Sequence, residues 1–223
     1  METVLMNTPK LVIFDMDGII FDSERLFMKF LQKNAAEYGY TVTEEQYIQT
    51  LGTGGDNLLR RLYSFYGPDY PNDIISPRTR QDLNAYAKIH GLPVKDGIPE
   101  LLAFLKERSI PCCVASSTHT PYIRSYLKKT GLDGFFSLIT GGDMVRNSKP
   151  HPEIFLTSCA HFGVAPQDAL VLEDSENGLL AAHNGQIPAI CIPDLKYPSA
   201  EYRDYACLIA DSAFDVLTYF SED

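Results

Sequence analysis

The stretch LVIFDMDG, residues 11–18, decides the fold of this chain. Its four apolar residues show no alternation, which is typical of a central strand in a parallel sheet covered on both faces. Two carboxylates, Asp15 and Asp17, follow and lead into a glycine turn. Ligands bind at the carboxyl ends of strands in open α/β sheets, so both side chains are expected at a binding edge. A buried acid there needs a metal, a cation or a hydrogen-bond donor.

The composition sets limits on the class of protein. The 223 residues are enough for one core and a small second domain, and the hydrophobic share of 45% with a charged share of 22% is typical of a globular protein. The net charge of −10 argues against a nucleic-acid partner. No apolar run is long enough to span a membrane, and residues 1–10 lack a signal pattern. We therefore expect a cytoplasmic protein, a monomer or weak dimer, with no membrane partner.

The cysteines suggest no metal site. Five are present, an odd number without any CxxC pair, at Cys112, Cys113, Cys159, Cys191 and Cys207. This spacing indicates neither a zinc site nor a disulfide framework. Buried reduced thiols are expected instead.

Residues 20–91 have the pattern of four helices. Their predicted starts are Asp22 or Ser23, a capping box at Thr43, Asp56 after a loop of Gly52, Gly54 and Gly55, and Ser76-Pro77. Glycines at residues 39 and 91 are expected to end the first and the last helix. The four helices predict a small bundle inserted directly after the first strand.

From residue 94 onward, short apolar runs alternate with helical patterns. Predicted strands cover residues 111–115, 135–140, 169–172, 189–192 and 207–210, and predicted helices cover 99–108, 120–130, 152–162, 178–183 and 214–220. Such alternation predicts a doubly wound parallel sheet, a Rossmann-like α/β core. The expected domains are a core of residues 1–19 and 92–223 and a helical cap of residues 20–91.

Polar side chains end apolar runs, or lie in the loops that follow them, at four places. These are Asp15 with Asp17, Ser116 with Ser117, Lys149, and Glu173 with Asp174. If the strands are parallel, all four places lie at one edge of the sheet. This convergence is the strongest functional signal in the sequence.

The two aspartates allow two interpretations. Asp side chains can hydrogen-bond their own backbone in a turn that ends a strand. The functional interpretation makes Asp15 a nucleophile able to form an aspartyl-phosphate, and Asp17 the group that exchanges a proton with the leaving group. Two such close carboxylates repel each other, and magnesium bound through carboxylates and phosphate would relieve the repulsion.

The other three places also have two interpretations each. Glu173 and Asp174 either cap the next helix or complete the metal site, with Asp174 favoured as the direct ligand. Ser116 either caps a helix or binds phosphate oxygens together with backbone N–H groups. Lys149, followed directly by the rigid segment Pro150-His151-Pro152, is either a solvated charge or the cation that offsets the acids. The nearby Asp143 and Arg146 either orient Lys149 or belong to a solvated loop.

These stretches resemble the haloacid dehalogenase-like hydrolases, in the subgroup with a small helical cap after the first strand. The matching stretches are DMDGIIFDSE at residues 15–24, VASS at 114–117, SKPHPE at 148–153 and LEDSENG at 172–178. Four motifs in this order cover essentially the whole chain, which is far more specific than one DxD pair.

The resemblance implies a role for each place. Asp15 would be the nucleophile, Asp17 the general acid and base, Ser116, Ser117 and Lys149 the phosphate binders, and Asp15, the Asp17 carbonyl, Glu173 and Asp174 the holders of Mg²⁺. The implied activity is Mg²⁺-dependent hydrolysis of a small phosphomonoester, such as a sugar phosphate, through an aspartyl-phosphate. In this family dehalogenation proceeds without a carboxylate at the position of Asp17, which argues against that reaction.

Two alternatives to the phosphatase stay open. Beta-phosphoglucomutases of similar architecture carry a histidine early in the first cap helix and an arginine in the cap loop. This sequence has Phe27 and the pair at residues 54–55 at the closest positions, which disfavours the mutase. A non-catalytic module that binds a phosphorylated ligand is the other alternative, and the complete set of catalytic groups argues against it.

Overall fold

In the computed structural model, residues 8–53 and 55–221 are described, and they contain one sheet of six parallel strands. The strand order is β3-β2-β1-β4-β5-β6. The bounds are β1 Leu11–Phe14, β2 Cys112–Ser116, β3 Leu138–Gly141, β4 Ala169–Glu173, β5 Ala189–Cys191 and β6 Leu208–Ile209. The order reverses between β1 and β4, where ligands bind in doubly wound sheets. The predicted fold class is confirmed.

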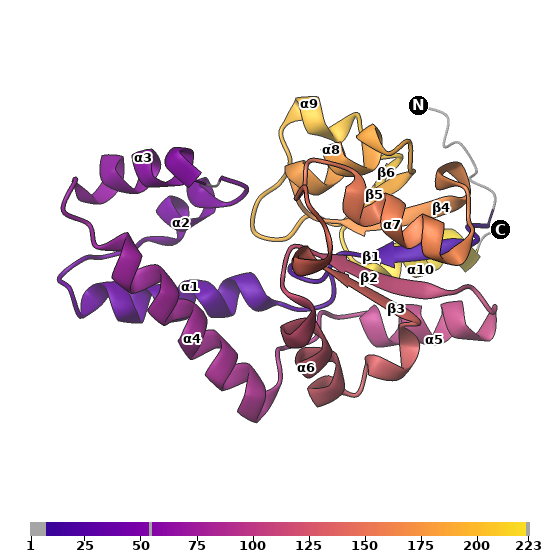
Figure 1. The fold of residues 1–223 in the computed structure, drawn as a ribbon, viewed down its shortest axis with the longest axis horizontal. Helices are drawn as coiled ribbons and strands as arrows, with labels where there is room; N and C mark the ends of the chain where they lie inside the picture. Colours follow the sequence, from indigo (N-terminus) through magenta and orange to yellow (C-terminus); the bar gives the residue numbers. More distant parts are fainter. Residues whose placement is uncertain (1–7, 54, 222–223) are drawn as a thin grey trace.

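Helices cover both faces of the sheet (Figure 1). One face packs on α5 (Ile98–Glu107), α6 (Thr120–Thr130) and α10 (Ala213–Ser221), and the other on α7 (Glu153–Phe162) and α8 (Glu176–Asn184). Within β1, Val12 and Phe14 pack on the first face, while Leu11 and Ile13 pack on the second. All four are fully buried, which explains why this strand lacks alternation.

The inserted segment forms four helices with a core of their own. These are α1 (Ser23–Ala36), α2 (Glu44–Thr50), α3 (Gly55–Tyr66) and α4 (Asn72–His90), and they lie to one side of the sheet in Figure 1. Their buried residues include Met28, Tyr47, Leu62 and Ile75, which pack on one another rather than on the sheet. The predicted capping box is present at Thr43. The exact domain boundaries stay a prediction.

The chain passes between sheet and cap twice, and the two connecting segments pair with each other. Phe21 forms an antiparallel bridge with Val94. The Asp22 N–H donates to the carbonyl of Pro93, and the Lys95 N–H donates to the carbonyl of Ile20, both at 2.9 Å. The cap is therefore attached to the core by one short double connection.

Two cap helices begin elsewhere than predicted. α3 begins at Gly55, so Asp56 lies in its first turn and does not cap it. α4 begins at Asn72, and Pro77 lies inside the helix rather than at its start. Burial of Ile75 in the cap core stabilises the additional turn, and the proline removes only one backbone donor from it.

Three further features of the chain differ from the expectations. β3 begins at Leu138, because residues 133–135 form a 3₁₀ turn. Cys207 is exposed, whereas the other four cysteines are buried as expected. The short helix α9 (Ala200–Arg203) was not predicted. Of the predicted glycine loop, Gly54 lies outside the described residues. None of the helices formed by residues 8–53 and 55–221 combines the length and apolar character that a membrane span needs.

Candidate active site

Asp15 lies directly after β1, at the point where the strand order reverses. Its N–H donates to the carbonyl of Leu172 at 2.9 Å, which extends the β1–β4 ladder by one residue. The residue is 7% exposed. Parallel pairing thus fixes the backbone of Asp15 beside the end of β4, where Glu173 lies. The predicted convergence of these two strand ends is present.

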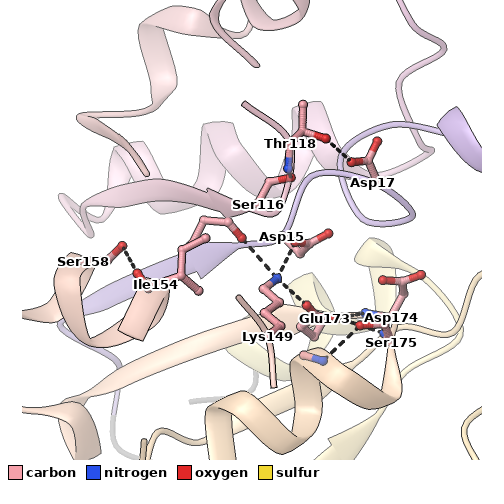
Figure 2. Close-up of polar contacts among 12 residues, drawn as sticks. Asp15, Asp17, Ser116, Thr118, Lys149, Ile154, Ser158, Glu173, Asp174 and Ser175 are labelled. Carbon is pink, nitrogen blue, oxygen red and sulfur yellow. Dashed lines mark hydrogen bonds and ion pairs between the residues drawn. The ribbon is translucent and has the colours of Figure 1, made fainter. Parts of the chain in front are cut away.

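Lys149 reaches this point from the loop after β3. Its Nζ lies 2.5 Å from Oδ1 of Asp15, 2.6 Å from Oε1 of Glu173 and 3.2 Å from the carbonyl oxygen of Ala115 (Figure 2). Three acceptors match the three donors of an ammonium group. Burial opposes the charged form, but the two carboxylates hold the pKa of Lys149 above its usual value. Lys149 is therefore a buried counter-cation and not a solvated surface charge.

Glu173 acts as a scaffold at the end of β4. While Oε1 accepts from Lys149, Oε2 accepts from the N–H of Asp174 at 2.9 Å and from the N–H and hydroxyl of Ser175 at 2.8 and 2.9 Å. A Cβ added at Gly178 would collide with this carboxylate. Because four donors already occupy both of its oxygens, Glu173 has little capacity left for a metal.

Asp174 has the opposite environment. In the described part of the chain, no donor reaches its carboxylate, which Figure 2 draws without a partner. Burial, and next the charges of Glu173 and Asp15, hold its pKa well above the usual range. Gly18, with a φ of +83°, leaves the space that Asp174 uses, because an added Cβ would lie 2.4 Å from Oδ2. The turn after β1 is thus shaped around this carboxylate.

The environment of Asp15 also disfavours its ionised form unless further positive charge is near. Burial raises its pKa to about 7, Lys149 opposes the rise, and Glu173 and Asp17 add to it. Lys149 alone therefore does not fully offset the acids at this edge. A second cation near Asp15 and Asp174 would stabilise both ionised carboxylates.

The donor set fits a hard divalent cation. Magnesium is usually bound through one or two carboxylates, with water and substrate phosphate as further ligands. Asp174 has no competing donor, and only Oδ1 of Asp15 is occupied by Lys149. Within residues 8–53 and 55–221, no cluster of three or more His, Cys, Asp or Glu side chains could hold a metal by itself. The site therefore fits an ion that also takes backbone, water and phosphate oxygens.

Asp17 is held by hydroxyl groups. Ser23 Oγ donates to its Oδ1 at 2.6 Å, and Thr118 Oγ1 donates to its Oδ2 at 3.0 Å. Thr118 is positioned in turn by its own N–H, which donates to Ser116 Oγ at 3.1 Å. Ser116 was predicted as part of the site, but the roles of Thr118 and Ser23 beside Asp17 were not. Asp17 is thereby oriented without the cation that Asp15 requires.

The loops around the site differ from the expectation in part. Asp143 accepts from the N–H and hydroxyl of Thr120, at 2.7 and 2.9 Å, and so caps the start of α6. The N–H of Arg146 donates to Glu153. Neither contacts Lys149, so the solvated-loop interpretation applies to both. Ser117 is exposed and lines the cavity above Asp15.

Two adjoining cavities lie over this edge of the sheet. One, of about 440 Å³, is lined by Asp15, Lys149 and Asp174, and the other, of about 760 Å³, extends between core and cap. Both are lined by Glu24 and Arg80 from the cap helices α1 and α4. A substrate can thus contact both halves of the molecule at once.

Several residues of these cavities were not predicted. Glu24 accepts a hydrogen bond from the hydroxyl of Tyr47, and burial raises its pKa to about 7. Asp194 accepts from Arg25 and Lys95, each at 2.6 Å, while its buried Oδ2 has no partner among the described residues. Glu24 lies within the first matching motif and could have been noticed. Asp194 lies in no motif, and only the three-dimensional structure shows its place.

Comparison with known proteins agrees with this geometry. Residues 12–192 match the family described as haloacid dehalogenase-like hydrolase. The chain belongs to this family. The matched range begins within β1, extends through β5 and contains the whole cap, so the family assignment covers every predicted site residue. The resemblance noted in the sequence is confirmed.

Individual relatives of this haloacid dehalogenase-like hydrolase are phosphatases. The chain is 29% identical to the phosphorylated carbohydrates phosphatase of Thermotoga maritima, over 80% of this chain and 82% of that one. It is 27% identical to hexitol phosphatase B of Escherichia coli K12, over 96% of each. The crystal structure of beta-phosphoglucomutase from Clostridium difficile shares the fold, with a TM-score of 0.71 at 22% identity over 96% of this chain and 98% of that one.

Proposed function

We propose that this protein is a magnesium-dependent phosphatase that hydrolyses a small phosphomonoester through an aspartyl-phosphate. The observation that carries the proposal is the pairing of Asp15 with Lys149 at the strand-order reversal. The carboxylate of Asp17, which is held by other side chains, lines the same cavity. A nucleophilic carboxylate and an acid–base group are the two parts that such a reaction needs.

In the first step, a carboxylate oxygen of Asp15 attacks phosphorus. A bond forms between Asp15 and phosphorus as the bond from phosphorus to the ester oxygen breaks. Asp17 gives its proton to that oxygen, and the alcohol leaves. The hydroxyls of Ser23 and Thr118 keep the carboxyl group of Asp17 oriented for this transfer.

In the second step, water attacks the phosphorus of the aspartyl-phosphate. Asp17, now ionised, takes a proton from the water, the bond from phosphorus to Asp15 breaks, and inorganic phosphate is released. Lys149 stays paired with Asp15 and offsets the charge that develops on the phosphoryl oxygens. Ser116, Ser117 and the backbone N–H groups beside them would contact those oxygens.

Magnesium would be held by Asp15, the carbonyl oxygen of Asp17 and Asp174. When bound, it would supply positive charge that offsets the carboxylates and the phosphoryl group together. The four donors already on Glu173 support Asp174 as the direct ligand and Glu173 as the group that orients Lys149 and Ser175.

The relatives support this reaction class and suggest a type of substrate. Two are named for phosphorylated carbohydrates and hexitol phosphates, in agreement with the sugar phosphate suggested by the sequence. The predicted enzyme class, a phosphoric monoester hydrolase, agrees with both names. We propose a small phosphorylated metabolite as the substrate of this chain.

The proposal is tested by phosphate release from a panel of phosphorylated metabolites, each assayed with magnesium and again with excess chelator. We expect turnover of at least one sugar or polyol phosphate that stops when magnesium is removed. Equal turnover with and without the chelator would contradict the magnesium site. No turnover of any phosphomonoester would favour the non-catalytic binding module.

A phosphosugar mutase is the second candidate, since a beta-phosphoglucomutase has the same fold. Both reactions begin with phosphoryl transfer, but a mutase transfers the group to another hydroxyl rather than to water. Phosphorus NMR of an incubation with glucose 1-phosphate separates them. Release of free phosphate alone is expected here, while formation of glucose 6-phosphate would identify the mutase.

A further inference from the structure

Positive charge is scarce in the two cavities, which adjoin seven acidic side chains. Among the described residues, the Lys and Arg side chains that line them are Lys149, Lys196 and Arg80. Lys149 is paired with Asp15 and Glu173, and Lys196 is paired with Glu176 at 2.7 Å. Arg80 has no hydrogen bond or ion pair in the described part of the chain. It is thus the cation available to a ligand.

Arg80 is exposed and has one aromatic neighbour among the described residues. It lies on α4 of the cap, lines both cavities, and its guanidinium carbon lies 5.8 Å from the ring centre of Phe27. Glu24 and Tyr126 both line the larger cavity. Burial raises the pKa of each, and the charge of Arg80 opposes the rise. Arg80 therefore lies between the acidic edge and the part of the cavity under the cap.

The face of α4 that carries Arg80 is polar at regular spacing. Asn72, Ser76, Arg80 and Asn84 all line the larger cavity. Residues four apart lie on one helix face, about 6 Å from one to the next. Asn84 already accepts from the hydroxyl of Tyr126. The row thus presents hydrogen-bonding groups along the cavity, with one positive charge within it.

We propose that Arg80 binds a second anionic group of the substrate, a carboxylate or a second phosphate, at the end away from the phosphoryl group that Asp15 accepts. This inference rests on the proposed phosphatase function. A guanidinium has a planar set of donors that matches carboxylate and phosphate oxygens. A neutral hydroxyl offers the guanidinium only a weaker, uncharged acceptor.

The inference predicts a preference between substrates that differ only at the distal end. Glycerol 3-phosphate and 3-phosphoglycerate differ by CH₂OH against carboxylate, as do glucitol 6-phosphate and 6-phosphogluconate. Fructose 6-phosphate and fructose 1,6-bisphosphate test a second phosphate. For at least one pair, we expect kcat/KM to favour the more anionic member. We call the kcat/KM of the more anionic member divided by that of the other member the preference ratio. Arg80→Gln should lower this preference ratio about tenfold or more, because charge-assisted hydrogen bonds are lost.

Lys88→Gln is the matched control. Lys88 lies two turns further along α4, is exposed and lines neither cavity, and the substitution removes the same charge. The preference ratio should not change in this variant. If Arg80→Gln also left the preference ratio of every pair unchanged, whether kcat/KM stayed the same or fell equally for both members, the inference would be contradicted and the role of Arg80 would be merely structural.

Binding measured by calorimetry on Asp15→Asn protein separates this inference from the proposed function. That variant keeps the cavity but lacks the nucleophile, so the affinity for each compound is independent of turnover. A preference for the anionic members that Arg80→Gln abolishes supports the subsite, even if no compound is hydrolysed. Equal affinity for both members of every pair contradicts the subsite, even if all are hydrolysed.

Discussion

The carboxyl edge of the sheet and the helical cap meet at the same cavities, but they hold their polar side chains in different ways. At the sheet edge, Lys149 contacts three oxygens and Glu173 accepts from four donors. On the cap, Arg80 has no polar partner among the described residues and Glu24 has Tyr47. The core therefore holds Lys149 and Glu173 in fixed positions before a ligand binds, whereas Arg80 on the cap remains available to a ligand.

Among variants that keep the proposed nucleophile Asp15, loss of Lys149 should have the largest effect. Lys149→Met leaves Asp15 and Glu173 buried without their counter-cation, and removal of one partner from a buried pair costs about 3–5 kcal/mol. Phosphate release should fall about 10²–10³-fold, since a preorganised positive donor is lost. Urea unfolding and a phosphate assay measure both effects.

The control for this variant is Lys10→Met, which breaks an ion pair with Asp168 whose side chains are 69% and 44% exposed. Exposed pairs are worth about 0–1 kcal/mol, so neither stability nor turnover should change much. If the two variants lost similar stability, the distinction between a preorganised edge and ordinary surface charge would be wrong.

Gly18→Ala should separate metal binding from backbone strain. The added Cβ would lie 2.4 Å from Oδ2 of Asp174, so the carboxylate must move. The magnesium concentration for half-maximal activity should rise about tenfold or more, as for other changes that displace a metal ligand. A magnesium titration of phosphate release measures it.

Gly39→Ala is the matched substitution. Gly39 has nearly the same φ, +82°, but a Cβ there would meet nothing within 4 Å. Both variants should lose about 1 kcal/mol of stability through the left-handed backbone. Only Gly18→Ala should change the magnesium requirement, and an equal change in both would contradict the assignment of Asp174.

Glu24→Gln tests the cap side of the comparison through pH. Burial raises the pKa of Glu24 from 4.5 to about 7, so the folded state favours the protonated form. That stabilisation is fully present below pH 4.5 and is lost as the pH rises through 7. Gln cannot ionise, so the variant should become the more stable of the two by about 1–3 kcal/mol above pH 7.

The measurement is the free energy of unfolding in urea between pH 4 and 9, with Glu45→Gln as a control at an exposed position of α2. The control should track the unmodified protein at every pH. A constant difference between Glu24→Gln and the unmodified protein across the whole range would show that Glu24 ionises as readily in the folded state as in the unfolded chain.

The smallest expected effect concerns the contact between cap loop and core. Asn177 Nδ2 donates to the carbonyl of Gly52 at 3.1 Å, from the start of α8 to the loop before α3. Asn177→Ala should raise KM about 2–10-fold, the equivalent of one hydrogen bond, with little change in kcat. Asn184 lies at the other end of α8 and donates a similar hydrogen bond to the carbonyl of Pro150. Asn184→Ala removes this bond and should leave KM unchanged. Equal KM values in the two variants would exclude a role for the cap contact.

The sheet edge could be predicted because parallel strands end together. The apolar runs before Asp15, Ser116 and Glu173 identify strands, and their parallel register brings their ends to one side. No comparable rule fixes the details of the contacts. Glu173 accepts hydrogen bonds from Lys149 and Ser175, whereas its neighbour Asp174 has no donor on its carboxylate among the described residues. This difference depends on side-chain directions, which a sequence does not contain.

The cap was predicted as four helices but not as a binding surface. Ser76-Pro77 predicts a later start of α4 than the structure has, because burial of Ile75 extends the helix to Asn72. The wrong start does not alter the spacing of polar residues on α4. What could not be predicted is how the helix is rotated, and hence that Arg80 faces the cavities.

The most direct test of Asp15 as the nucleophile is phosphate release from para-nitrophenyl phosphate by Asp15→Asn with saturating magnesium. The substitution keeps the shape and hydrogen-bonding capacity of the side chain but removes the nucleophilic carboxylate. We expect phosphate release to fall on the order of 10³-fold or more, with an unchanged circular dichroism spectrum. Turnover within a few-fold of the unmodified protein would contradict the assignment of Asp15 as the nucleophile.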